Sequence, residues 1–164
     1  MGDLERPEAP GTSPRFKHFD DVPWEEVRKL DFGDHTTSVR EKWLDFSPRF
    51  LSLWAEWDPG MMIHGHGHNS NHIVFVLEGD MTCGDVQCSK GMHIALDQGD
   101  TFGPFIAGPN GVTLFEVMMG DPRSFSSDEE QWAKLLAEKG AAQAPNPPIN
   151  MPDWLKDTRS EAPE

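Results

Sequence analysis

The sequence contains no tyrosine, only two cysteines, and half as many basic as acidic residues. Without tyrosine, neither a phenolic acid nor a tyrosine-derived cofactor can take part in its chemistry. The 14 Lys and Arg residues against 28 Asp and Glu residues give a formal net charge of −14. That field repels nucleic acid backbones and anionic membrane surfaces, both of which bind clustered cations. We therefore expect no nucleic-acid partner and no membrane partner.

Long apolar runs are also missing. No stretch approaches the roughly 18 apolar residues of a membrane span. The first residues, Met1–Arg6, lack the basic start and apolar stretch of a signal peptide, so we expect a cytoplasmic protein. The sequence also lacks a phosphate-binding loop, a dinucleotide fingerprint and a nucleophile elbow, which argues against the enzyme classes that use them.

The two cysteines, Cys83 and Cys88, lie close together in the sequence. In a reducing cytosol we expect free thiols. Their spacing would also let them face each other across a hairpin, which leaves a disulfide or an accessory soft-metal site open.

A length of 164 residues suits one domain with a substantial core. We predict a disordered or extended leader over residues 1–15 and a barrel over residues 16–122. A C-terminal helix over residues 123–140 and a proline-rich, extended tail over residues 141–164 follow.

Short strand candidates with glycine-rich turns between them fill the middle of the chain. They cover residues 49–57, 61–68, 72–77, 80–83, 92–96 and 112–119. Many short strands without helical periodicity indicate an all-β barrel or sandwich. Residues 20–25 are expected to form a loop or a short helical turn.

A helix is expected near the C-terminus. Ser127 and Glu130 have the spacing of a capping box, Trp132 begins an apolar stripe, and Gly140 is a typical stop signal. In the tail that follows, Trp154 and Leu155 would pin the chain to the barrel or to a second subunit. Because such a tail needs a surface to cover, we expect a homodimer.

Four of the seven histidines fall within nine residues of each other, at His64, His66, His68 and His72. Residues two apart on a strand project to the same face. Asn69–Asn71 is expected to form a turn that brings His72 back beside His66 and His68. Three neutral imidazoles on one face suit Fe(II), Zn, Mn, Ni or Cu.

This segment resembles the first conserved motif of the cupin superfamily. Its elements are Pro59-Gly60, then His66-x-His68, then the apolar stretch 73–79 ending in Glu-Gly. In the cupin motif a glutamate normally follows the two histidines, and that position is occupied here by His72. A third histidine thus replaces the usual carboxylate.

The second cupin motif is degraded. In the best match, which covers Gly91–Phe102, Asp97 stands at the usual proline, Gly99 at the conserved glycine and Phe102 at the ligand histidine. A shifted match starting at Gly99 would place Asn110 near the ligand position, but it leaves too short a return to the next strand. We prefer the first match, in which the fourth ligand is missing.

The resemblance covers about residues 20–120. It implies an all-β fold of the cupin type, a double-stranded β-helix or jelly-roll barrel, with one C-terminal helix and extended termini. It also implies one divalent transition metal, held by His66, His68 and His72, with Fe(II) favoured.

Two further residues are candidates for proton transfer. His64 shares the face of the expected ligands one pleat away, which favours a rim residue or an outer-shell base. Glu116 alternates with Leu114 and Met118, so it either points into the barrel as a general base or missing ligand, or ends its strand in solvent. His18, His35 and His93 are expected to be structural or exposed.

Three functions follow from this site, all on a small-molecule substrate. The first is a non-heme Fe(II) dioxygenase with a three-histidine site. The second is non-oxidative lyase or isomerase chemistry with Zn, Mn or Ni, in which His64 or Glu116 moves the proton. The third is a metal-binding or small-ligand-binding module without turnover, since the fold alone does not decide the activity.

Overall fold

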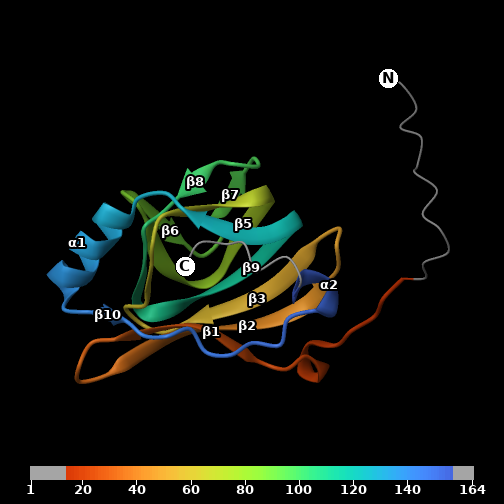
Figure 1. Cartoon of the computed structure of the whole chain (residues 1–164), viewed down its shortest axis with the longest axis horizontal. Helices are drawn as coiled ribbons and strands as arrows, with labels where there is room; N and C mark the ends of the chain where they lie inside the picture. The colour runs from red at the N-terminus through yellow and green to blue at the C-terminus, as the bar shows by residue number, and fades with distance from the viewer. Residues whose placement is uncertain (1–13, 157–164) are drawn as a thin grey trace.

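Two long strands dominate the computed structural model, which describes residues 14–156 (Figure 1). The strands are β1 (Glu25–Asp31), β2 (Thr36–Phe46), β3 (Leu51–Trp57), β4 (Met62–Ile63), β5 (His66–Cys83), β6 (Val86–Ser89), β7 (His93–Leu96), β8 (Thr101–Phe102), β9 (Phe105–Ser126) and β10 (Ala142–Gln143). The helices are the 3-10 turn η1 (Phe19–Asp21), α1 (Glu129–Lys139) and α2 (Asp153–Lys156).

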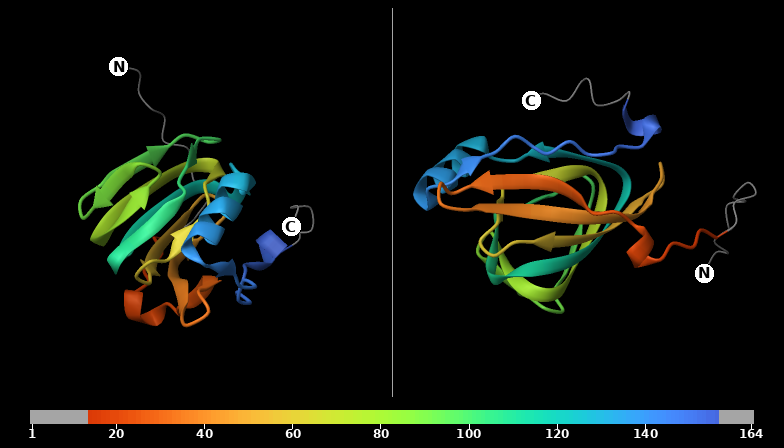
Figure 2. Two further views of the ribbon diagram at one scale, coloured as in Figure 1. Left: turned by 90° about the vertical axis from the view of Figure 1, so that its left-hand side faces the viewer. Right: turned by 90° about the horizontal axis from the view of Figure 1, so that it is seen from below.

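All strand pairs are antiparallel, in the order β10-β1-β2-β3-β9-β5-β6. Strand β4 pairs with β9, and β7 and β8 pair with β5. The long strands β5 and β9 pair with each other along most of their length and curve around the barrel (Figure 2). The expected all-β barrel is confirmed.

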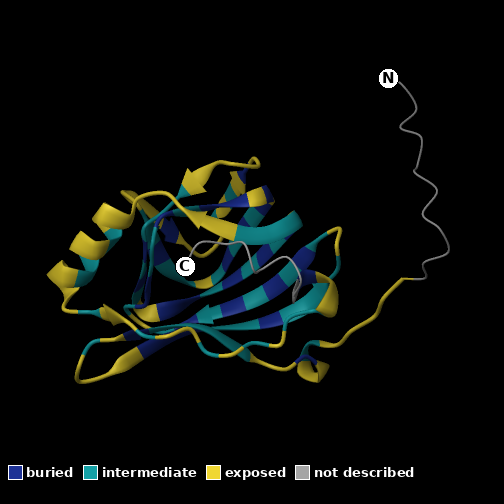
Figure 3. Cartoon of the chain, in the orientation of Figure 1, coloured by how far each residue is buried: buried dark blue, intermediate teal, exposed yellow. Residues whose placement is uncertain are grey.

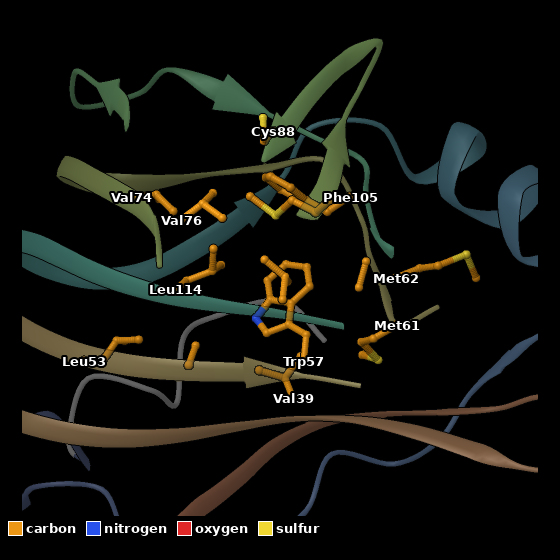
Figure 4. Close-up of a cluster of buried hydrophobic side chains, with 14 of the residues drawn as sticks. Val39, Leu53, Trp57, Met61, Met62, Val74, Val76, Cys88, Phe105 and Leu114 are labelled. Carbon is orange, nitrogen blue, oxygen red and sulfur yellow. The ribbon is translucent and has the colours of Figure 1, made fainter. Parts of the chain in front are cut away.

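Alternation along the strands produces the core. In β3 the odd-numbered residues, Leu51 to Trp57, are buried and the even-numbered ones are half-buried. Buried residues alternate with more exposed ones along the strands of the barrel (Figure 3). Val74 and Val76 of β5 meet Leu114 of β9 and Trp57 of β3 in this core (Figure 4). Burial of this apolar surface is the main favourable contribution to the stability of the fold.

The turn predicted at Asn69–Asn71 is wrong. Strand β5 runs without interruption from His66 to Cys83, so three expected strands are one. The reason is that β9 supplies a partner along β5. The register shifts between His68 and Ser70, where β9 loops out at residues 121–123. Pro122 lacks an N–H to donate to a ladder, and a bulge accommodates it.

Strands β1 and β2 were missed by the sequence analysis. The segment expected to be a loop or turn contains η1 at its start, but β1 begins at its last residue, Glu25. The reason is compositional, because charged residues are interspersed through EEVRKLD and TTSVREKWLDF and hide the alternation of apolar positions. A register shift after Glu26 disturbs the alternation of β1 further.

The C-terminal helix begins at Glu129, and its N-cap is Asp128, not Ser127. The Asp128 carboxylate accepts a hydrogen bond from the Gln131 backbone N–H at 2.8 Å, as N-cap residues do. The predicted end is confirmed, because Gly140 has a left-handed φ of 65°. None of the helices in the described residues is long and apolar enough to cross a bilayer.

The tail folds back on its own barrel. Strand β10 pairs with the edge strand β1, and the Leu155 side chain of α2 is buried. The Trp154 ring lies edge-on to Phe46 of β2, with 5.4 Å between centroids. The tail therefore packs on its own barrel and does not need a second subunit to cover. The homodimer stays a prediction, and the tail does not support it. Most of the expected leader lies outside the described residues, apart from Pro14 and Arg15.

Candidate functional site

A cavity of about 270 Å³ lies inside the barrel. Its walls come from β1, β2, β3, β5, β8 and β9, and the tail lines one side through Asn146, Pro147, Ile149, Met151 and Leu155. Most of the lining is apolar, but His66, His68, Glu41 and Glu116 also face it. This combination of an apolar wall and a few polar groups is typical of small-molecule sites.

The expected histidine ligands are brought together. The ring centroids of His66 and His68 are 5.1 Å apart, and those of His68 and His72 are 4.7 Å apart. All three occupy the same face of β5. Residues four apart on a straight strand are separated by roughly 13 Å, and the register between β5 and β9 shifts between His68 and Ser70, where the His68 and His72 rings approach each other.

Backbone carbonyls orient two of the rings. Nδ1 of His66 hydrogen-bonds the carbonyl of His64 at 2.9 Å, and Nδ1 of His68 hydrogen-bonds the carbonyl of Pro122 at 2.9 Å. A carbonyl can only accept, so both rings carry their proton on Nδ1 when neutral. Nε2 is then the nitrogen with a lone pair for a metal or a substrate. The β9 bulge is therefore part of the site, because it supplies the Pro122 carbonyl.

Both rings are held in the neutral form. Burial lowers the pKa of His66 to about 3, and the neighbouring histidines lower it in the same direction. Burial, followed by the charge of His72, lowers the pKa of His68 to about 4. Both Nε2 lone pairs are therefore available at neutral pH, as metal ligation requires.

His72 has a different partner. Its Nε2 lies 2.9 Å from a carboxylate oxygen of Glu116 on β9, and only 1% of the His72 side chain is exposed. Nδ1 of His72 is buried and has no hydrogen-bond partner. An orphaned ring nitrogen of this kind loses the solvation of water without replacement. When Nε2–H donates to Glu116 in the neutral ring, Nδ1 has a lone pair that a bound metal could use.

The residues fit a metal by donor type. Three imidazoles, two of them held neutral by burial and oriented through Nδ1 by carbonyls, are ligands that borderline divalent metals prefer. Within residues 14–156, however, no three His, Cys, Asp or Glu side chains already surround a common point. Metal binding would therefore require side-chain adjustment; at His72, Nε2 is engaged by Glu116 and Nδ1 is the nitrogen left for a bond to a metal.

Phe102 occupies the position that the second motif assigns to a ligand histidine. It pairs with His66 across β8 and β5, and its ring centroid lies 5.0 Å from that of His66 and 5.6 Å from that of His72. Phe105 packs on it at 4.6 Å. The fourth side of the histidine group is thus apolar.

His64 lies at the edge of this group, before β5. Its ring is 5.3 Å from that of His66 and 5.9 Å from that of Trp132 on α1. It borders a second, much smaller cavity beneath the helix. Burial lowers the pKa of His64. The contact that His64 makes with the site is structural, because its backbone carbonyl orients the His66 ring.

Glu116 points into the cavity, where only 9% of it is exposed. The sequence analysis missed a second carboxylate, Glu41 on β2, because β2 itself was missed. Glu41 also lines the cavity and accepts a hydrogen bond from Nε1 of Trp43 at 2.8 Å. Arg28 reaches the same cavity because the bulge in β1 turns it inward opposite Val39. The alternation of Val39, Glu41 and Trp43 could have revealed this face.

The remaining candidates lie elsewhere. Cys83 and Cys88 are free thiols, and burial raises the pKa of both. His93 is exposed at the start of β7. His18 and His35 are exposed, as expected; the first accepts the Asp20 N–H at 3.2 Å, and the second stacks on Phe32.

No protein-family model and no curated protein matches this sequence. Solved structures do match. The polyketide cyclase RemF from Streptomyces resistomycificus is 20% identical, with a TM-score of 0.56 over 78% of this chain and 96% of that one. A protein from Methylibium petroleiphilum PM1, proposed in its name to be an acetylacetone dioxygenase, is 14% identical, with a TM-score of 0.55 over 74% and 94%.

An RmlC-like cupin from Shewanella frigidimarina NCIMB 400 is 16% identical, with a TM-score of 0.51 over 73% of this chain and 96% of that one. All three likenesses span nearly the whole of the matching chain. At these identities they establish the fold and leave the activity open.

Proposed function

We propose that this chain, which has the cupin fold, is a metal-dependent enzyme that moves a proton on a small, largely apolar organic substrate. The observation that carries this proposal is the Glu116 carboxylate, which lines the largely apolar cavity with His66 and His68 and lies 2.9 Å from Nε2 of the buried His72. A buried carboxylate beside metal-type ligands is a typical general base. The reaction class is the lyase or isomerase type.

His66, His68 and His72 would hold the metal, for which Zn, Mn, Ni and Fe(II) are the candidates. The bound cation would supply Lewis-acid polarisation of a carbonyl oxygen. The remaining chemistry belongs to the protein. Glu116 accepts a proton from the substrate carbon, and Phe102 and Phe105 form an apolar wall beside the histidines.

The cavity lining indicates the substrate class. Leu51, Leu53, Trp57, Leu114 and Met118 form its apolar walls. An aromatic or alicyclic body would bury apolar surface there, at about 25 cal/mol per Å². A single polar group on that body would face the histidines.

The oxygenase remains the second candidate. Its support is the three-histidine set, whose imidazoles would add no negative charge to Fe(II), together with the apolar Phe102 on the fourth side. The carboxylate hydrogen-bonded to the third histidine favours proton transfer over it, because it places a base beside the histidine group.

The experiment separates these functions. Protein purified without an affinity tag is loaded with Fe(II), Zn(II), Mn(II) or Ni(II) and incubated with diketones, hydroxyketones and thiols, with and without O2. Turnover that is equal without O2 supports proton transfer. Turnover that requires O2 and Fe(II) replaces it with the oxygenase, and no turnover under either condition would indicate a binding module.

A further inference from the structure

We propose that Glu41 is a second catalytic carboxylate, which donates a proton to the substrate while Glu116 removes one, so that the site performs a 1,3-proton shift on a carbonyl compound. This inference rests on the proposed function and names its substrate class, a ketone with an acidic C–H. It is carried by the location of Glu41 in the barrel, its hydrogen bond and its surroundings.

The register of the sheet places Glu41 on the face that lines the cavity. Glu41 pairs with Ala55 of β3, and the neighbouring inward pair is Trp43 with Leu53. Leu53 in turn pairs with Glu116 of β9. Glu41 on β2 and Glu116 on β9 therefore lie on the same concave face, with Ala55 and Leu53 of the intervening strand β3 between them. Both carboxylates line the same cavity, from two strands.

A carboxylate at this place is costly for the fold. A purely structural position would have an apolar residue, like its neighbours Val39 and Leu53. The Trp43 indole N–H supplies a hydrogen bond of 2.8 Å, which fixes the orientation of the carboxyl group. Glu41 is partly buried and lines the cavity.

The charges around Glu41 favour a proton donor. Burial, and secondly the negative charge of Glu116, raise the pKa of Glu41 to about 7. The Trp43 hydrogen bond and the positive charge of Arg28 on β1 act in the opposite direction. Two nearby carboxylates do not both ionise easily. A general acid whose pKa is near the working pH is the most effective.

The step balances without a co-reactant. Glu116 takes a proton from the carbon beside the carbonyl, and the electron pair moves into the dienolate. Glu41 then gives its proton to the distal carbon, so a β,γ-unsaturated ketone becomes its conjugated isomer. Glu116 ends protonated and Glu41 ionised; after the product leaves, Glu116 loses its proton to solvent and Glu41 takes one up, which restores both.

The test uses cyclohexenone with its double bond in the β,γ position, added to the Zn(II)-loaded full chain. Formation of the conjugated ketone is followed by ultraviolet absorbance, with Glu41→Gln and Glu41→Asp as variants. The matched control is Glu56→Gln, because Glu56 points outward from β3. Glu41→Gln should lower kcat about 100-fold with KM nearly unchanged, and Glu41→Asp should restore part of the rate.

The pH profile and infrared spectra give independent readouts. The wild-type rate should fall above about pH 7, and this limb should be absent in Glu41→Gln. Metal-free protein at pH 6 should show the infrared band of a neutral carboxylic acid, which Glu41→Gln removes.

The possible failures are distinguishable. An active wild type with an equally active Glu41→Gln variant overturns the role of Glu41 and leaves the proposed function standing. A wild type that does not isomerise the ketone overturns both proposals for this substrate class. Absence of the infrared band overturns the assignment of Glu41 as a proton donor even if the variant fails to fold.

Discussion

The carboxylate of Glu116 on β9 lies 2.9 Å from Nε2 of His72 on β5, and both side chains are buried in the barrel. The two residues are 44 positions apart in the sequence. Their contact joins the two longest strands at the histidine group. This contact connects the histidines expected from the motif to Glu116, a carboxylate that lies outside the motif.

Removal of the oriented imidazoles should abolish metal binding. We expect one divalent transition metal per chain, and His66→Ala and His68→Ala should each remove most of it. His64→Ala should leave most of the metal in place, because that ring faces Trp132. Elemental analysis after dialysis measures the occupancy. Full occupancy in both of the first two variants would contradict the assigned site.

Replacing the apolar fourth side with a ligand should strengthen metal binding. The Phe102 ring lies 5.0 Å from His66 and 5.6 Å from His72 between centroids, so Phe102→His places an imidazole within reach of the same metal. We expect affinity to rise at least tenfold and turnover to slow, because an open coordination position is lost. Competition with a chromophoric chelator measures the affinity. Phe102→Leu is the control, and an equal rise in that variant would exclude ligation.

The stability of the metal-free protein should depend on pH through Glu41. Its pKa is raised from 4.5 to about 7, so between these values the folded state keeps a proton that the unfolded state has lost. The free energy of unfolding therefore falls as pH rises through this window, by up to about 3 kcal/mol and less where water enters the cavity.

Glu41→Gln should lack this dependence, since its amide is neutral throughout. Urea unfolding of both proteins at pH 5 and at pH 8 measures it. The variant should gain stability relative to wild type between the two values, and an unchanged difference would show that Glu41 titrates normally.

The tail should contribute to both stability and the cavity wall. Leu155 is 4% exposed and lines the cavity, so Leu155→Ala should lower the free energy of unfolding by about 2 kcal/mol. Trp154 is 39% exposed, and Trp154→Ala should cost less. Thermal unfolding of both variants tests the ranking, and a Leu155→Ala protein as stable as wild type would contradict the docking of the tail.

The first motif could be located from sequence alone because its information is local. The spacing of His66, His68 and His72 within one segment places the rings on one face by strand geometry. The expected turn between them was wrong. The rings nevertheless meet on one continuous strand, at the point where its register with β9 shifts beside Pro122. The end of α1 at Gly140 was equally local.

Whether Glu116 faced the cavity or solvent could not be decided from its own strand. Alternation with Val39 and Trp43 could have given the face of Glu41, but its proximity to Glu116, the inward turn of Arg28 and the position of the Pro122 carbonyl could not be read from the sequence, for a shared reason. Each depends on strand register and on bulges, which are set by partners far away in the chain. The sequence by itself determined a barrel with a histidine group. Only closure of the barrel decided which charged side chains share the cavity with it, because a shift of one residue in register would turn each of them to the opposite face.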